Sequence, residues 1–162
     1  MADALNHIET PYKAIPEKEQ AIELWVSKPL TSRDLSISTS ATTNVTGSML
    51  FTKGLLKDVD QRTYFREEVF QHLNWMPETK QGLTHLERAY AQFAIYTSGV
   101  CQGRYTLRIT HNTLRENKSF LQRNGMTGVS WGGAKAIISN PLLVGKTMKL
   151  FLVSDAYKLI IE

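Results

Sequence analysis

The sequence predicts a mainly β protein with helices, an α+β fold. Apolar and polar side chains alternate along residues 104–110, where Leu107 and Ile109 fall on one face of an extended chain and Arg108 falls on the other. Runs rich in β-branched and large apolar residues near the end of the chain are typical of strands. A four-residue apolar period in the middle of the chain predicts helices there. A β core with a helical cover accounts for all three patterns.

The first third of the chain is predicted to hold an N-terminal arm, two strands and a polar loop. Residues 1–20 form the arm, because two prolines interrupt any helix and apolar residues are sparse. The pattern Ile-Glu-Leu-Trp-Val-Ser at residues 22–27 indicates the first strand. Hydroxyl-bearing side chains dominate residues 35–47, which can extend but cannot bury a full face. Residues 49–51 return to the core.

Two helices are predicted within residues 55–94, as an insertion that covers the β core. Aspartates near its start can cap the first helix, whose buried face would carry Phe65 and Val69. Thr84 would begin the second helix, with Glu87 three residues later at the spacing of a capping box. We assign no chemistry to these helices.

The last third of the chain is predicted to be rich in strands. Its glycine-rich stretch contains Trp131, which is expected in the core because tryptophan is usually largely buried. The chain ends at Glu162 directly after a predicted strand, which suggests a fragment of a longer protein, with a natural end as the alternative. Beyond residues 104–110, the strands are expected at residues 134–139, 147–153 and 157–161.

Length and composition indicate one folded domain, residues 21–162. The chain has 162 residues, of which 42% are hydrophobic and 21% charged, a balance that excludes a disordered tail and a coiled-coil rod. No apolar run approaches the roughly 20 residues that cross a bilayer, so no membrane partner is expected. The single cysteine, Cys101, excludes an internal disulfide and favours a cytoplasmic setting.

Positive charge is concentrated in the second part of the chain. Residues 1–100 carry 10 Lys/Arg and 12 Asp/Glu, a net charge of −2, whereas residues 101–162 carry 9 and 3, a net charge of +6. A basic segment of this kind is the electrostatic footprint of a polyanion partner. The alternative is an excess of cations that serves solubility alone.

No motif predicts a catalytic centre with a cofactor. Val-Gly-Lys-Thr at residues 144–147 lacks the upstream glycine of a phosphate-binding loop, since Asn140 stands there. Glu78 and Lys80 have the Glu-x-Lys form of a nuclease half-site, which would need further carboxylates to hold Mg²⁺. The four histidines show no spacing typical of metal ligands. The segment is therefore expected to be non-catalytic, without metal or cofactor.

Two polar segments that flank predicted strands form the candidate binding surface. The first polar loop comprises residues 28–44, and the second polar loop comprises residues 111–124. Arg, Asn and Gln can pair with base edges in the major groove, while Lys, Ser and Thr can bind phosphate oxygens. The candidate DNA-binding residues are Lys28, Ser32, Arg33, Asp34, Ser36, Ser38, Thr42 and Asn44 of the first loop, Arg108 of the adjoining strand, and Asn112, Arg115, Asn117, Lys118, Gln122 and Arg123 of the second loop.

The order of these features resembles the B-three-type DNA-binding pseudobarrel of plant transcription factors and of effector domains in EcoRII-type restriction endonucleases. Leu-Trp-Val-Ser-Lys-Pro-Leu-Thr-Ser-Arg-Asp at residues 24–34 resembles the family's first strand and its Lys-x-Leu-Thr/Ser-x-x-Asp sequence. Residues 49–51 and the helix expected after them resemble its second strand and first helix, and residues 103–109 resemble its central strand. Residues 118–121, 142–145 and 148–151 resemble its closing half. The resemblance implies an open seven-stranded pseudobarrel flanked by two or three helices, with two arms that grip the major groove.

The sequence thus favours a sequence-specific double-stranded DNA-binding domain, the recognition or effector part of a restriction endonuclease. A catalytic domain C-terminal to this segment is its expected companion. Two alternatives stay open. The chain could be a structural or assembly subunit of a phage or virus, which its arm and hydroxyl-rich segment also fit. It could also be a nuclease that uses Glu78 and Lys80.

Overall fold

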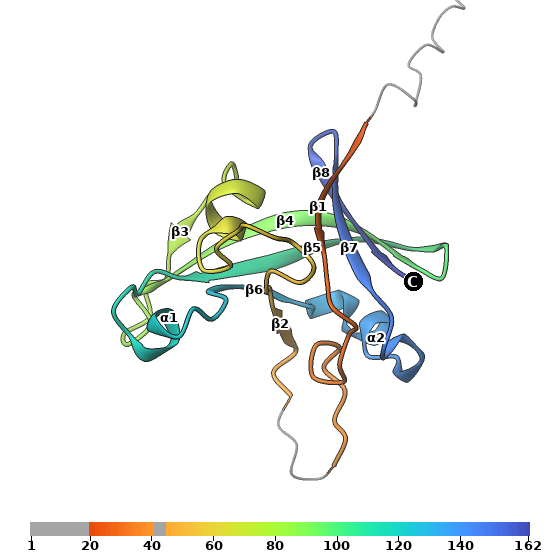
Figure 1. Cartoon of the computed structure of the whole chain (residues 1–162), viewed down its shortest axis with the longest axis horizontal. Coiled ribbons are helices and arrows are strands. Elements are labelled where there is room, and N and C mark those ends of the chain that lie inside the picture. The colour runs from red at the N-terminus through yellow and green to blue at the C-terminus, as the bar shows by residue number, and fades with distance from the viewer. Residues whose placement is uncertain (1–19, 41–44) are drawn as a thin grey trace, which may run out of the picture.

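A computed structural model describes residues 20–40 and 45–162 of the chain (Figure 1). The predicted N-terminal arm, apart from its last residue, and the candidate contacts Thr42 and Asn44 lie outside the described residues. The described helices are short: a π-helical turn η4 (Phe65–Val69), α1 (Lys118–Leu121), η5 (Gly132–Ala134), α2 (Lys135–Ile138) and η6 (Pro141–Leu143). The strands are β1 (Ala21–Val26), β2 (Ser48–Leu50), β3 (Met76–Pro77), β4 (Leu86–Thr97), β5 (Val100–Asn112), β6 (Thr127–Ser130), β7 (Met148–Val153) and β8 (Ala156–Ile161).

Seven of these strands form one continuous path in the order β1-β7-β8-β4-β5-β6-β2, and β3 pairs with β4 beside that path. The pairing of β4 with β8 is parallel, and the other pairings are antiparallel. The long β4–β5 hairpin crosses the molecule, and the sheet curls around the core as an open half-barrel (Figure 1). The predicted fold class, mainly β with a few helices and an open seven-stranded pseudobarrel, is confirmed.

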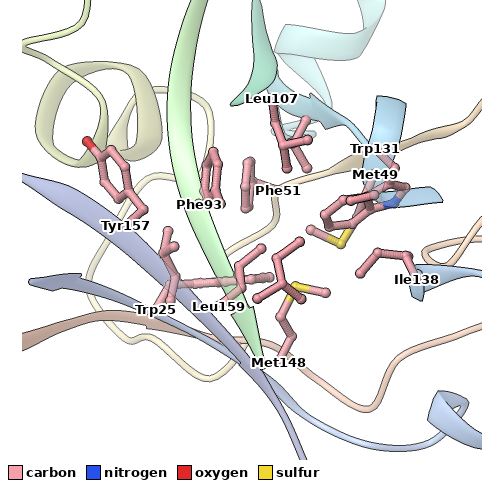
Figure 2. Packing of buried hydrophobic residues seen from close by; sticks show 14 of the residues in the cluster. Trp25, Met49, Phe51, Phe93, Leu107, Trp131, Ile138, Met148, Tyr157 and Leu159 are labelled. Atoms are coloured by element: carbon pink, nitrogen blue, oxygen red, sulfur yellow. The ribbon is translucent and has the colours of Figure 1, made fainter. Parts of the chain in front are cut away.

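The inner face of the curled sheet holds the core (Figure 2). The alternation predicted in β5 is confirmed, since Leu107 and Ile109 are buried and Arg108 is exposed. Trp131 is fully buried, as its type predicts. Phe51, which directly follows β2, stacks on another ring of the core with its centroid 4.9 Å from that of Phe65. Among the described residues, no helix has both the length and the apolar character needed to cross a bilayer.

The prediction of a helical insertion at residues 55–94 is wrong. Its helical part is the short turn η4, in which Phe65 and Val69 are buried as expected. The predicted second helix is the strand β4, whose buried residues alternate with exposed ones through Ala89, Ala91 and Phe93. Small alanines on the inner face concealed this two-residue period in the sequence. A twelve-residue strand paired on both sides gains ladder hydrogen bonds that outweigh local helix propensity.

The strand predicted at residues 134–139 is also wrong, because this segment forms η5 and α2. Ala134 and Ile138 are buried, while Lys135 and Ala136 between them are exposed. That four-residue spacing is helical and places one side of a short helix against the core. The strands predicted at residues 147–153 and 157–161 are confirmed as β7 and β8.

Gly54 is predicted to be the glycine least able to accept a side chain. It has φ +60°, and a Cβ there would lie 2.2 Å from the carbonyl oxygen of Val26. Gly54→Ala should lower the free energy of unfolding by about 3 kcal/mol or more, since strain and a backbone clash add. Gly82→Ala, with φ +85° and open space around it, should cost only about 1 kcal/mol. Urea denaturation measures both; equal costs would contradict this packing.

Candidate nucleic-acid interface

The two polar loops lie at opposite ends of the β2–β6 pair. The first loop leads towards Ser48, which pairs with Ser130, and Leu50 at the other end of β2 pairs with Gly128. The second loop ends shortly before Thr127, the first residue of β6. In Figure 1 the first loop (orange) and the segment around α1 (cyan) lie on either side of β2 in the lower half of the view. The pair therefore separates the two loops and fixes where each begins or ends.

A hollow of about 300 Å³ lies on the outer face of the sheet, in the region between the two loops. Arg108 faces Ser130 across the β5–β6 pairing, and Thr110 faces Gly128. Arg108 donates from Nη2 to Ser130 Oγ at 3.2 Å, so its guanidinium lies over β6. The hollow is lined by Ser48 and Leu50 of β2, Leu86 of β4, Arg108, Thr110 and Asn112 of β5, Met126 beside β6, and Gly128, Val129 and Ser130 of β6.

Arg108 and Asn112, the latter from the start of the second loop, are thus two predicted site residues that the fold places together in this hollow. Thr110 was missed as a site residue, although its alternation with Arg108 places it on the same exposed face of β5. Ser48 and Ser130 were missed because their place depends on the β2–β6 pairing. No local pattern in the sequence predicts that pairing.

The first polar loop contains a closed helical turn. The amide of Leu35 donates to Thr31 O at 3.3 Å and that of Ile37 donates to Ser32 O at 2.8 Å. Asp34 Oδ2 accepts hydrogen bonds from Thr31 N at 2.9 Å and Thr31 Oγ1 at 3.0 Å. The Asp34 carboxylate therefore stabilises the turn. Its Oδ2 atom is occupied within the loop, although Asp34 is predicted to contact a ligand. Ser36 ends the turn with φ +55°, a position that favours glycine.

Hydrogen bonds from the core fasten this turn to the body of the domain. Trp131 Nε1 donates to Asp34 O at 3.0 Å, and Ser139 Oγ donates to Leu35 O at 2.8 Å. Ser36 is 4% exposed, so burial argues against its predicted role as a DNA contact. Around this anchor, Lys28, Arg33 and Ser38 are exposed, and Ser32 is half-buried.

The second polar loop is built in the same way around α1. Asn117 caps the helix, because its Oδ1 accepts from Phe120 N at 3.0 Å. The amide of Asn124 donates to Ser119 O at 3.1 Å, and Arg123 ends the turn with φ +62°. The Asn117 oxygen is therefore occupied within the loop. The predicted contacts that the structure leaves exposed here are Arg115, Lys118, Gln122 and Arg123.

Residues before η4 brace the second loop. Gln61 Nε2 donates to Arg123 O at 2.7 Å. Arg62 donates to Phe120 O at 3.1 Å, and its guanidinium lies 4.2 Å from the centroid of the Phe120 ring. Arg62 Nη2 lies 2.8 Å from Asp60 Oδ2, so the two side chains form an ion pair. The hydrogen bond from Arg62 lowers the pKa of Asp60 to about 2. The helical turns of both loops are therefore held by the protein's own contacts.

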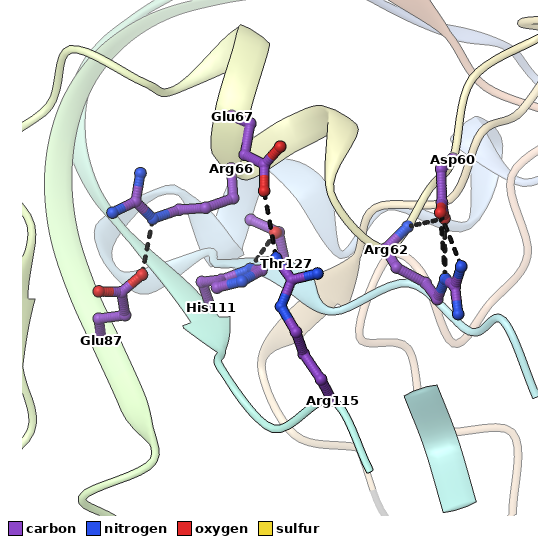
Figure 3. Close-up of polar contacts among 8 residues, drawn as sticks. All are labelled: Asp60, Arg62, Arg66, Glu67, Glu87, His111, Arg115 and Thr127. Atoms are coloured by element: carbon purple, nitrogen blue, oxygen red, sulfur yellow. Dashed lines mark hydrogen bonds and ion pairs between the residues drawn. The ribbon is translucent and has the colours of Figure 1, made fainter. Parts of the chain in front are cut away.

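A second hollow, of about 250 Å³, lies behind the second loop and has balanced charge. Arg66 Nε is 2.6 Å from Glu87 Oε1, and Arg115 Nη2 is 3.3 Å from Glu67 Oε2 (Figure 3). His111, at its base, shares a 2.8 Å hydrogen bond with Thr127 Oγ1. Each arginine of this hollow pairs with a carboxylate. The hollow therefore has no excess positive charge that would attract an anion.

The carboxylate of Glu78, on which the nuclease alternative depends, already has partners within the chain. Glu78 Oε2 is 3.4 Å from Arg88 Nη1, and Glu78 Oε1 accepts from the amides of Thr79 and Lys80. Within residues 20–40 and 45–162, no three His, Cys, Asp or Glu side chains come together as metal ligands.

Comparison of the chain with protein-family models, with curated proteins and with solved structures finds no match. Functional interpretation therefore depends on the charge and geometry of the loops. The loops and the strand face between them contain two acidic residues, Asp34 and Glu116, against six cations. The six are Lys28, Arg33, Arg108, Arg115, Lys118 and Arg123.

His111 should make the domain less stable in mild acid. Burial lowers its pKa to about 4, against the opposing influence of Glu87 and Glu67 and with support from Arg66 and Arg115. Between pH 6.5 and 4 the unfolded chain binds a proton that folded His111 does not. The free energy of unfolding should therefore fall by up to about 1.4 kcal/mol per pH unit as the pH decreases through this range.

Urea denaturation between pH 7 and 4.5 measures this dependence. His111→Gln, which cannot titrate, should flatten the profile, whereas the exposed His72→Gln should leave it as steep as in the wild type. The low pKa of Asp60, about 2, adds its own loss of stability only as the pH falls below about 4. Identical profiles for the wild type and His111→Gln would contradict the assignment.

Proposed function

We propose that this chain binds double-stranded DNA sequence-specifically, through its two polar loops in the major groove. The observation that carries the proposal is the pair of preformed, cation-bearing loops on either side of a hollow that contains Arg108. In such a complex, contacts with the phosphates position the protein on the duplex, and contacts with the base edges determine sequence specificity. Of the six cations, Arg115 is paired with Glu67, and the other five supply the electrostatic attraction.

The hydrogen bonds within the loops indicate which side chains can read bases. Arg33 and Arg123 are exposed and have guanidinium groups suited to guanine O6 and N7. Gln122 is exposed, and its amide suits adenine. Asn112 Oδ1 already accepts from Leu114 N at 2.9 Å, and Asn117 Oδ1 caps α1. Gln122 is therefore a better adenine reader than either asparagine.

The strand β6, which lies between the loops, has a length comparable to the width of the major groove. β6 has four residues and spans about 10 Å of extended chain, close to the roughly 12 Å width of the major groove. Because both turns are closed before a ligand arrives, binding loses little conformational entropy in ordering them. The predicted contacts Lys28, Ser38 and Lys118 are exposed and suit phosphate oxygens.

The proposal extends to the kind of protein. The resemblance of residues 24–34 and of the later strands to the B-three-type family supports a recognition or effector domain of a restriction endonuclease. In that arrangement a catalytic domain would follow in the complete protein, and this segment would itself be non-catalytic. Cytoplasmic location is part of the same proposal and is compatible with the free, exposed thiol of Cys101.

Selection from a random duplex library, followed by fluorescence anisotropy at several salt concentrations, tests the proposal. The wild type should enrich a short motif. Arg33→Ala and Arg123→Ala should each lose about 1–3 kcal/mol of discrimination at one base position. Lys118→Ala should weaken all sequences alike and reduce the salt slope by about 1. Lys149→Ala, which removes a cation of β7 already paired with Glu162, should change neither property.

Three outcomes would contradict the proposal. The first is absence of binding to any duplex at low salt. The second is a large homo-oligomer in light scattering without affinity for DNA, which would favour the structural or assembly subunit of a phage or virus. The third is Mg²⁺-dependent cleavage that is lost in Glu78→Ala, which would favour a nuclease.

A further inference from the structure

A third hollow, of about 290 Å³, lies on the sheet near the β4–β5 and β7–β8 turns. Ala94 of β4 pairs with Arg104 of β5 on one side and with Lys158 of β8 on the other, so the three residues form one row across the sheet. Tyr96, two residues along β4, and Ser154 in the β7–β8 turn also line the hollow. None of these residues belongs to the two polar loops.

The two cations of this hollow are uncompensated. Arg62, Arg66, Arg88 and Arg115 each lie within 4 Å of a carboxylate. In the part of the chain that the structure describes, neither Arg104 nor Lys158 has such a partner. No acidic residue is among those that line the hollow, and Asp155 of the adjacent turn is not one of them. The hollow therefore has a positive potential that an anion would neutralise.

The geometry favours a compact anion held between the two side chains. Strands on either side of β4 are about 10 Å apart, and the methyl group of Ala94 between them leaves the space open. The Lys158 ammonium lies 4.4 Å from the centroid of the Tyr96 ring, a cation–π contact that limits its motion. The guanidinium of Arg104 can donate two parallel hydrogen bonds to a tetrahedral oxyanion.

We infer that this hollow binds a phosphate group. Two sources carry that chemistry: the backbone of a nucleic acid and a small phosphate ester. Arg104 lies four residues before Arg108 on the same face of β5, about 14 Å along the strand. A duplex held at the polar loops could therefore extend to this hollow. Binding of a free phosphate would stand independently of the proposed function.

A titration with pyrophosphate at constant ionic strength, followed by ¹H–¹⁵N NMR of the whole chain, tests the site directly. Saturable shifts are expected at the amides of Ala94, Tyr96 and Lys158. The double variant Arg104→Ala/Lys158→Ala should bind at least tenfold more weakly, and Ala94→Leu, which fills the hollow, should do the same. Lys149→Ala, the matched loss of a cation that is already paired, should bind like the wild type. The side chains of the four substituted residues are exposed or half-buried, so the substitutions should leave the fold intact. Circular dichroism checks that the variants fold.

Duplexes of about one and about two helical turns then distinguish the two sources. If the backbone is the ligand, the double variant should bind the longer duplex more weakly and reduce its salt slope by about 2, with the shorter duplex unaffected. If a small phosphate ester is the ligand, only pyrophosphate binding should change. Shifts that grow linearly with pyrophosphate, or a double variant that binds both ligands like Lys149→Ala, would overturn the inference. A wild type that binds pyrophosphate here and no duplex would contradict the proposed function alone.

Discussion

The three-residue pairing of β2 with β6 is the constraint on which the arrangement of the two loops depends. Phe51 extends this pairing through its amide, which donates to Thr127 O at 2.8 Å, and its buried ring stacks on Phe65. Gly125 permits the close approach, because a Cβ there would lie 2.2 Å from Phe51 O. The chain that enters β2 and the chain that enters β6 are therefore fixed by one packed region. The turn of the first loop shares this frame, because Trp131, directly after β6, donates to Asp34 O at 3.0 Å.

Order within each loop has an energetic cost. Ser36 and Arg123 end the two helical turns with positive φ, where a side chain costs about 1 kcal/mol or more relative to glycine. Contacts with the body of the domain offset that cost: Trp131 and Ser139 hold the first loop, and Gln61 and Arg62 hold the second. Strained backbone that the surrounding structure maintains is common where function requires a fixed geometry.

Patterns within one strand could be predicted from the sequence, whereas pairings between distant segments could not. The alternation in β5 identified Leu107 and Ile109 as core and Arg108 as exposed, and the structure confirms it. β4 was missed because alanines mark its inner face. The loops were identifiable by their polarity, but the capping roles of Asp34 and Asn117 depend on turns whose closure local composition does not specify. The brace from Gln61 to Arg123 joins residues 62 positions apart, and no local signal predicts it.

Mapping of backbone amide shifts on addition of a mixed-sequence duplex at low salt tests the central claim most directly. The perturbed amides are expected in the two loops, in β2 and β6, and at Arg108, Thr110 and Asn112 of β5. Amides of η4 and of the buried rings beneath the sheet should keep their positions, since the helical turns of both loops are already closed. Shifts confined to β1 and β7, or rearrangement of the core on binding, would contradict a preformed interface between the loops.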